Sequence, residues 1–101
     1  MEAKLYMYRN FDVKALRIVE LLEKCNVSLH IVVKDPDIDF DIFSEEVGHT
    51  VKRLPKVIID GEYVGGYYDL VEYLVIRKII NFSGEILNDN KSATAGKVFG
   101  K

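Results

Sequence analysis

The residue best suited to covalent chemistry in this chain of 101 residues is its one cysteine, Cys25. A thiolate there would be a nucleophile for disulfide exchange if its pKa were lowered by a helix N-terminus or by nearby cations. A single cysteine excludes an internal disulfide and any Cys-x-x-Cys pair, and it fits a reducing compartment. Two interpretations stay open, a packed thiol and a resolving or regulatory thiol.

Carboxylates are the second possible source of chemistry. The segment 35–46 has aspartates at alternate positions and a closing glutamate, which is the ligand spacing of an EF-hand calcium loop. The position that requires glycine for the sharp turn of such a loop is Phe40. We therefore expect a solvated acidic loop and no metal site. His30 and His49 are too far apart in sequence to be read as a metal pair.

The segment from Arg53 to Leu70 has the sequence signals of a binding site. Pro55 precedes an apolar strand, and Asp60-Gly61 predicts a hairpin turn in which both residues have positive φ. Gly65-Gly66 opens a helix, and the N-terminus of a helix is a natural site for an anion.

Composition restricts the class of protein. Hydrophobic residues make up 49% of the chain and charged residues 30%, as in an ordinary globular domain. The net charge of −2 lacks the basic footprint of nucleic-acid binders. No apolar run approaches the roughly 20 residues of a membrane span, and the N-terminus lacks the pattern of a signal peptide. We expect a monomeric, cytoplasmic protein that binds neither nucleic acid nor membrane.

The elements that position these residues follow from hydrophobic periodicity. Their predicted order is β-α-β-α-β-β-α. Strands are expected at 5–8, 28–33, 57–60 and 62–64, and helices at 13–25, 39–47 and 67–80. Residues 1–82 then form one domain. Residues 83–101 are polar and without period, so we expect a mostly disordered tail, with a short ordered turn at 85–87 left open.

This order and its flanking residues resemble the glutaredoxin branch of the thioredoxin fold over residues 1 to about 80. The family pattern runs Thr-Val-Pro, an apolar strand, a turn such as Asp-Gly, Val-Gly-Gly, and a helix start with Asp and Leu. The matching residues here are Arg53-Leu54-Pro55, Val57-Ile58-Ile59, Asp60-Gly61, Val64-Gly65-Gly66 and Asp69-Leu70. The resemblance implies an α/β fold with a four-stranded mixed sheet flanked by three helices.

The family's redox motif, Cys-Pro-Tyr-Cys, has no counterpart here. Lys14-Ala15 match the Lys-Ala that often follows it, so Arg9-Asn10-Phe11-Asp12 occupy its four positions. None of these residues carries sulfur, and thiol–disulfide exchange requires a thiolate. Asp12 is expected to cap the first helix. At 1.5 Å per residue, Cys25 would lie roughly 20 Å along that helix from the loop.

The resemblance also implies a ligand groove around a cis Leu54–Pro55 bond. Leu54 would offer its backbone N–H and C=O to an extended peptide. In the family, the helix start after Gly65-Gly66 takes a carboxylate of glutathione, and an aspartate, here Asp69, takes its amino group.

Three positions of this groove depart from the family or admit two interpretations. Tyr68 stands where many relatives have an acidic or small polar residue. Arg53, which replaces a threonine, forms either a positive rim with Arg9 or a solvated cation. Phe11, Tyr67 and Tyr68 form either an exposed aromatic patch or packing against the loop.

These observations favour a binding module without catalytic residues. Its ligand would be a protein segment or, more weakly, glutathione, and no other cofactor is expected. One alternative is a glutathione-dependent thiol-transferase, or a glutathione-transferase-like enzyme that activates bound glutathione without its own cysteine. A second alternative is an interaction protein that acts through the acidic loop or the tail.

Overall fold

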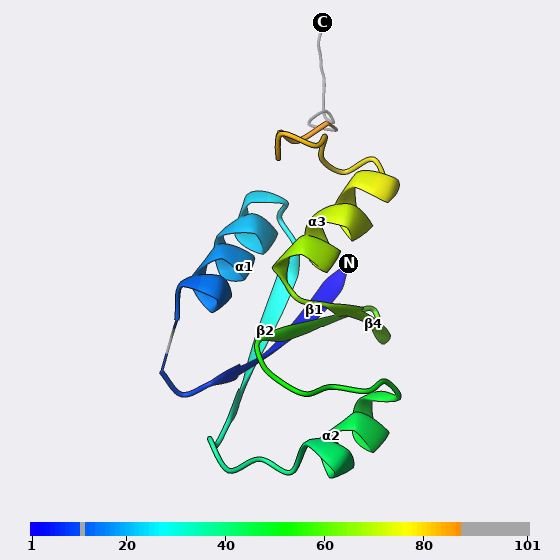
Figure 1. The fold of residues 1–101 in the computed structure, drawn as a ribbon. Coiled ribbons are helices and arrows are strands. Elements are labelled where there is room, and N and C mark those ends of the chain that lie inside the picture. Colours follow the sequence, from blue (N-terminus) through cyan, green and yellow to red (C-terminus); the bar gives the residue numbers. More distant parts are fainter. Residues whose placement is uncertain (11, 88–101) are drawn as a thin grey trace, which may run out of the picture. The chain divides into compact units, whose positions relative to one another are not determined.

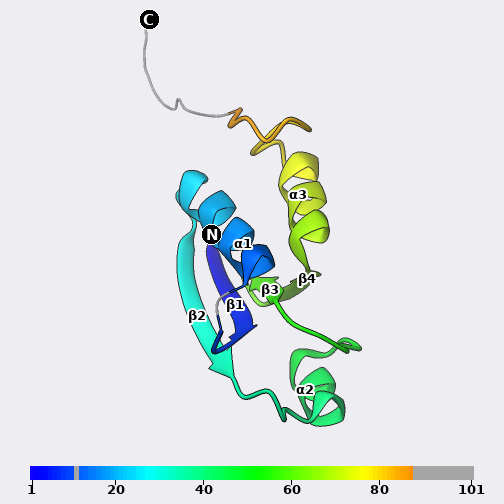
Figure 2. The same cartoon turned by 60° about the vertical axis from the view of Figure 1, so that its left-hand side comes forward.

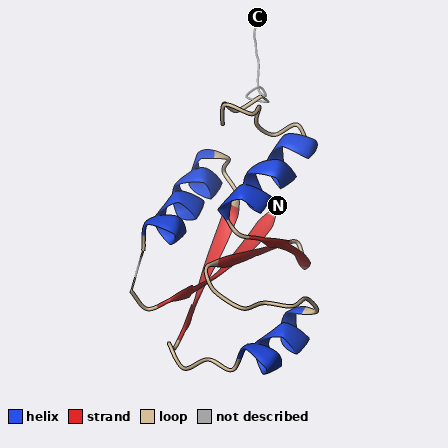
Figure 3. Ribbon diagram, in the orientation of Figure 1, coloured by secondary structure: helices blue, strands red, loops and turns tan. Residues whose placement is uncertain are grey.

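The computed structural model describes residues 1–10 and 12–87. Its elements have the predicted order (Figures 1 and 3). They are β1 (Glu2–Tyr8), α1 (Val13–Lys24), β2 (Ser28–Lys34), α2 (Phe40–Val47), β3 (Lys56–Ile59), β4 (Glu62–Gly65) and α3 (Tyr67–Ile76). The chain divides into two compact units, Met1–Leu70 and Val71–Lys101, so that α3 begins in the first and ends in the second. Among the helices described, none is long and apolar enough to cross a bilayer.

The first unit contains a four-stranded mixed sheet in the order β2-β1-β3-β4. β1 is parallel to β2 and antiparallel to β3, and β3 is antiparallel to β4. The parallel pair is joined by α1, which lies alongside these two strands (Figure 2). The expected α/β architecture is confirmed. β1 begins three residues earlier than predicted, because its alternating pattern extends back to Glu2.

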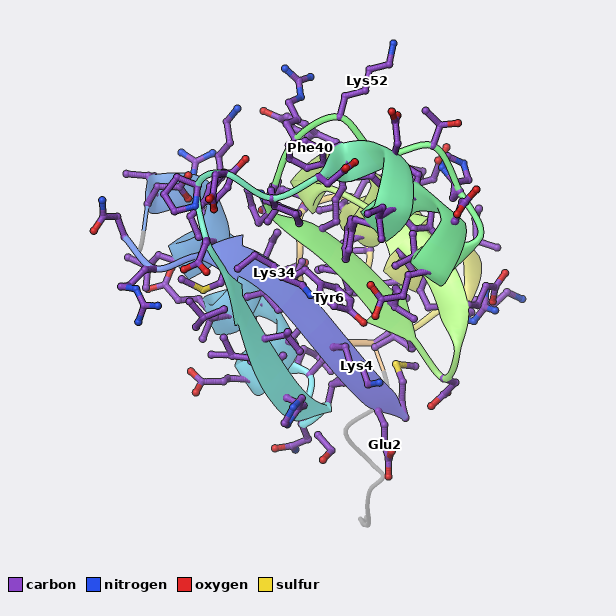
Figure 4. The ribbon with its side chains drawn as sticks, turned by 90° about the horizontal axis from the view of Figure 1, so that it is seen from below. Glu2, Lys4, Tyr6, Lys34, Phe40 and Lys52 are labelled. Atoms are coloured by element: carbon purple, nitrogen blue, oxygen red, sulfur yellow. The ribbon has the colours of Figure 1, made fainter. Side chains whose placement is uncertain are left out.

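Alternation along β1 divides its side chains between two faces of the sheet. Ala3, Leu5 and Met7 are buried on one face. Tyr6 points to the other face, where α2 packs. There it forms a buried cluster with Phe43, Val51 and Leu54. Figure 4 shows this face, with α2 in front of the sheet and α1 behind it.

The cluster under α2 is held by aromatic packing. The Tyr6 and Phe43 rings meet edge to face, with centroids 4.9 Å apart. The ammonium of Lys34 lies 5.8 Å from the Tyr6 ring centre and 5.4 Å from that of Phe43. Both distances are within the range of a cation–π contact. The loop that leads to Pro55 is therefore anchored on the α2 side of the sheet.

Local signals determine where the first two helices end. Asp12 caps α1, since its Oδ1 accepts a hydrogen bond of 2.8 Å from the Ala15 N–H. After the helix, Asn26 takes the left-handed conformation, φ +58°, which asparagine tolerates. Gly48, φ +75°, ends α2 in the same conformation. The predicted hairpin turn is confirmed by positive φ at Asp60 and Gly61.

The end of α3 differs from the prediction. The helix ends at Ile76, not Ile80. Lys78 takes the left-handed conformation, φ +60°. The N–H groups of Lys78 and Ile79 then donate to the Val75 and Leu74 carbonyls, which is a Schellman motif. The motif was missed because a lysine occupies the position where glycine is usual.

The segment after α3 is ordered by one asparagine as far as the structure describes it. The Asn81 Oδ1 accepts hydrogen bonds of 2.9 Å from the N–H groups of Ser83 and Glu85. Ile80 and Ile86 form an antiparallel bridge. Residues 88–101, most of the predicted tail, lie outside the described residues.

Candidate functional site

A cleft of about 300 Å³ lies in the first unit beside the Leu54–Pro55 bond, and we call it the Leu54–Pro55 cleft. All the groove residues predicted from the sequence line it, except Gly65. The lining residues are Lys14, Arg17, Arg53, Leu54, Pro55, Lys56, Gly66, Tyr67, Tyr68 and Asp69. Segments far apart in sequence therefore meet here: the first turns of α1, the approach to β3, and the start of α3.

The side chain and the backbone of Leu54 have different surroundings. The peptide bond to Pro55 is cis. Leu54 is 7% exposed as a whole residue, and it belongs to the cluster under α2. Within the described residues, neither its N–H nor its C=O has a hydrogen-bond partner. A buried residue that lines the cleft thus has backbone groups that no other described residue engages.

Gly65 leaves room for the Asp69 carboxylate at the start of α3. Its φ is +123°, and a Cβ atom there would lie 2.5 Å from the Oδ2 atom of Asp69. Oδ2 instead accepts a hydrogen bond of 3.1 Å from the Gly66 N–H. Asp69 therefore caps α3 from its third position, as the acidic partner does in a capping box. Part of the predicted anion site at this helix start is occupied by the protein's own carboxylate.

Three cations of the cleft were not predicted as site residues: Lys14, Arg17 and Lys56. Lys14 and Arg17 are three residues apart on α1, so they share one face of the helix. Lys56 follows Pro55 directly, and its Nζ lies 3.7 Å from the Cβ position that a side chain at Gly66 would have. The spacing on α1 was the available signal, but only the fold brings that face to Pro55.

Burial lowers the pKa of Lys56, and the charges of Arg53 and Lys14 lower it further. The carboxylate of Asp69 opposes this effect. Desolvation is thus the main cause of the lowered pKa, and repulsion by Arg53 and Lys14 adds to it. An anion in the cleft would relieve that repulsion.

Two tyrosines at the start of α3 form the aromatic part of the cleft. Their rings meet edge to face, with centroids 5.4 Å apart. The guanidinium of Arg17 lies 5.9 Å from the centre of the Tyr67 ring, so Tyr67 helps to orient this cation. Tyr68 is 79% exposed. The predicted patch is thus present for Tyr67 and Tyr68, while Phe11 lies outside the described residues.

The described residues of the loop that occupies the place of the redox motif, Arg9, Asn10 and Asp12, are absent from the lining of the cleft. Arg9 instead forms an exposed ion pair of 3.4 Å with Asp35, so the pair Arg9 and Arg53 does not form a common rim. Asn10 is exposed. Asp12 is the cap of α1 described above. Among the described residues of this loop, Arg9 forms an ion pair and Asp12 caps a helix, and none carries a thiol.

Cys25 lies at the C-terminal cap of α1, whereas Asp12 caps its start. The thiol is half-buried and free. Burial raises its pKa, and the charge of Lys24 only partly offsets this. A raised pKa reduces the thiolate fraction, which is the opposite of the activation that a redox cysteine requires. Cys25 is also absent from the lining of the cleft.

A second, wider depression of about 780 Å³ lies on the α2 side of the sheet, and we call it the α2-side hollow. Its charged side chains are Glu2, Glu46, Asp60 and Lys4. Tyr6, 8% exposed, also lines it, and burial together with the charge of Glu46 raises the pKa of this tyrosine. No pattern in the sequence predicted this hollow, whose lining comes from β1, β2, β3, the end of α2 and the turn after β3.

The acidic loop has structural uses in the fold. Asp39 caps α2, where its Oδ1 accepts hydrogen bonds from the N–H groups of Asp41 and Ile42. Among the residues described, no three His, Cys, Asp or Glu side chains gather as metal ligands would. His49 stacks on Tyr63, with ring centres 4.1 Å apart, and His30 is an exposed strand residue.

Comparison with solved structures decides the fold. Glutaredoxin 1 from Francisella tularensis, complexed with cacodylate, matches 75% of this chain over 93% of its own, with a TM-score of 0.61 and 17% identity. The Escherichia coli glutaredoxin matches 76% of this chain over 96% of its own, with a TM-score of 0.56 and 19% identity. The chain has the glutaredoxin fold. The reduced E. coli protein agrees, with a TM-score of 0.58 and 20% identity over 73% of this chain and 93% of its own.

The similarity to glutaredoxins is found in the structure and not in the sequence comparisons. No family model and no curated protein matches the chain by sequence. Identities of 17–20% fit that result. The glutaredoxin fold is therefore established for this chain, and its activity has to be argued from its own cleft.

Proposed function

We propose that this protein is a non-catalytic glutaredoxin-like binding module that holds an extended protein segment in the Leu54–Pro55 cleft. The observation that carries the proposal is the unpaired backbone of Leu54, fixed in position by a buried side chain. An extended segment can complete both hydrogen bonds of this edge without any sulfur chemistry. Glutathione, which is itself a short peptide, is a weaker ligand of the same groups.

The sequence supports a role without turnover. The chain holds one cysteine, at the far end of α1 from the loop that replaces the redox motif. Neither a mixed disulfide at the cleft nor a resolving step is available to such a chain. The fold is thus kept for positioning a ligand.

Selection of peptides on the immobilised protein, followed by amide NMR with the selected peptides, tests the proposal. We expect shifts at Leu54, Lys56, Gly66 and Asp69. Peptides that shift only the amides around Lys4, in the α2-side hollow, would contradict the cleft assignment. A selection that yields no binder would contradict the protein-segment ligand.

A glutathione-dependent disulfide reduction assay tests the absence of turnover. We expect no rate above the uncatalysed reaction, and no difference between wild type and Cys25→Ser. Turnover that Cys25→Ser abolishes would show instead that the distant thiol is an active nucleophile.

A further inference from the structure

The Leu54–Pro55 cleft concentrates positive charge in a protein of net charge −2. Its lining contains four cations, Lys14, Arg17, Arg53 and Lys56, and a single acid. Within residues 1–10 and 12–87, none of the four forms an ion pair. Four uncompensated cations around one cleft are the electrostatic complement of an anionic ligand.

The single acid of the cleft does not neutralise this cluster by an ion pair. The Oδ2 of Asp69 is hydrogen-bonded to the Gly66 N–H at 3.1 Å. The lowered pKa of Lys56 has burial as its main cause, and repulsion by Arg53 and Lys14 acts in the same direction, against the charge of Asp69.

The cations border the cleft from two different segments. Arg53 and Lys56 flank Leu54–Pro55 on the approach to β3, while Lys14 and Arg17 belong to α1. An extended chain that pairs with the Leu54 backbone projects alternate side chains to opposite sides. Acidic side chains of such a chain can therefore reach cations of both segments.

We propose that the segment bound in the Leu54–Pro55 cleft is acidic, an extended stretch of polypeptide that carries two or more carboxylates. This inference rests on the proposed function and adds the chemical class of the partner. Glutathione fits the cluster less well, because its ammonium group adds a positive charge to a lining that already holds four cations and one acid.

The probe is a short capped peptide with glutamate at successive positions, so that carboxylates project to both sides, and its matched control has glutamine at the same positions. Isothermal titration at about physiological ionic strength, where the Debye length is about 8 Å, suppresses the general field of the protein. We expect the glutamate peptide to bind wild type at least about tenfold more tightly than the glutamine peptide, from two or more exposed charge pairs.

Two variants with equal charge change locate the interaction. Arg53→Gln with Lys56→Gln removes two cations of the cleft. Lys4→Gln with Lys52→Gln removes two lysines outside it, one on β1 and one in the loop that follows α2 (Figure 4). We expect the first pair to weaken the glutamate peptide about tenfold and the second to change it less than about twofold. Thermal melting checks that both variants fold, and Lys14→Gln with Arg17→Gln tests the α1 side independently.

The outcomes separate this inference from the proposed function. Equal affinity of the two peptides, with amide shifts at Leu54 and Gly66, would overturn the acidic preference and leave the binding module intact. Equal losses in the two double variants would also overturn it, because the effect would then come from the total charge. Binding of the glutamate peptide in competition with glutathione, and tighter than glutathione, would support it. Binding that shifts only amides outside the cleft would overturn both proposals.

Discussion

The Leu54–Pro55 cleft and the α2-side hollow lie at opposite ends of β3, and their charges have opposite signs. The cleft, at Lys56, has four cations and one acid. The hollow, next to Asp60, has three acids and one lysine. The smaller of the two depressions is the better candidate for an anionic partner. Neither sign is visible in the net charge of −2, so the preference for a ligand is a property of the local surface.

The two regions share the cluster under α2 and differ in how deeply their residues are buried. Leu54, at the cleft, is a buried member of the cluster. Ile58, which lines the hollow and packs against the same cluster, is only half-buried. Substitutions in the two regions therefore test this difference.

The largest expected effect is that of Leu54→Ala. Truncation of this buried side chain should lower the free energy of unfolding by about 2–5 kcal/mol. Ile58→Ala, the same truncation at a half-buried position that lines the hollow, should cost about 2 kcal/mol, the low end for this change. Urea denaturation of the two variants measures the difference. Equal costs would mean that Leu54 does not anchor the cleft.

The next effect is that of Gly65→Ala. The new methyl group would collide with the Asp69 carboxylate, and alanine strongly disfavours φ of +123°. We expect a loss of about 3 kcal/mol in unfolding free energy. Gly61→Ala is the matched change at the hollow, because Gly61 has φ +82° and no atom near its Cβ position. It should cost about 1 kcal/mol, and a ranking in the reverse order would refute the clash.

A smaller effect concerns the pH dependence of peptide binding. An acidic peptide favours protonated Lys56, so affinity is full below the pKa of Lys56 and falls as pH rises through it. Because that pKa is lowered, the fall should begin at lower pH than for an ordinary lysine. We expect a loss of about threefold, the strength of one exposed ion pair.

Lys56→Arg is the variant that tests this pH dependence, because a guanidinium stays charged at alkaline pH. Titrations of the glutamate peptide from neutral to alkaline pH should show no early fall for this variant. Lys4→Arg, in the hollow, should keep the wild-type profile. An unchanged profile for Lys56→Arg would assign the fall to another group.

The smallest expected effect is that of Arg9→Ala. This arginine lies outside the cleft, and its ion pair with Asp35 has both side chains at least 70% exposed. Its removal should change the free energy of unfolding by at most about 0.5 kcal/mol and leave affinity for the acidic peptide unchanged. A tenfold loss of affinity, similar to that expected for the Arg53 and Lys56 pair, would extend the cation cluster beyond the cleft.

The fold could be predicted from the sequence because the residues that begin and end its helices and strands act locally. Asp12 and the turn Asp60-Gly61 act within a few residues and perform their predicted roles, and Asn26 and Gly48 act over the same short range. Lys78 shows the limit of such signals, since it adopts a left-handed conformation that favours glycine, and the helix ends early.

The candidate site was predictable only in part. Residues near Pro55 and at the start of α3 are close together in sequence, so their pattern pointed to one groove. Lys14 and Arg17 reach that groove only through the tertiary fold, and Arg9 was associated with it although it pairs elsewhere. Sequence patterns therefore do not predict which charged residues that are distant in sequence meet in the cleft.

The Asp69 carboxylate competes with any bound carboxylate for the N–H group of Gly66, to which it is already hydrogen-bonded. A carboxylate tethered three residues away is present at a higher effective concentration than a free ligand attains. An incoming carboxylate must displace it to reach that N–H group, and otherwise interacts with the cations alone. A ligand with one carboxylate is therefore at a disadvantage, while a chain with several can lose one contact and keep the rest. In the proposed complex, Asp69 would therefore favour partners with several carboxylates over partners with one.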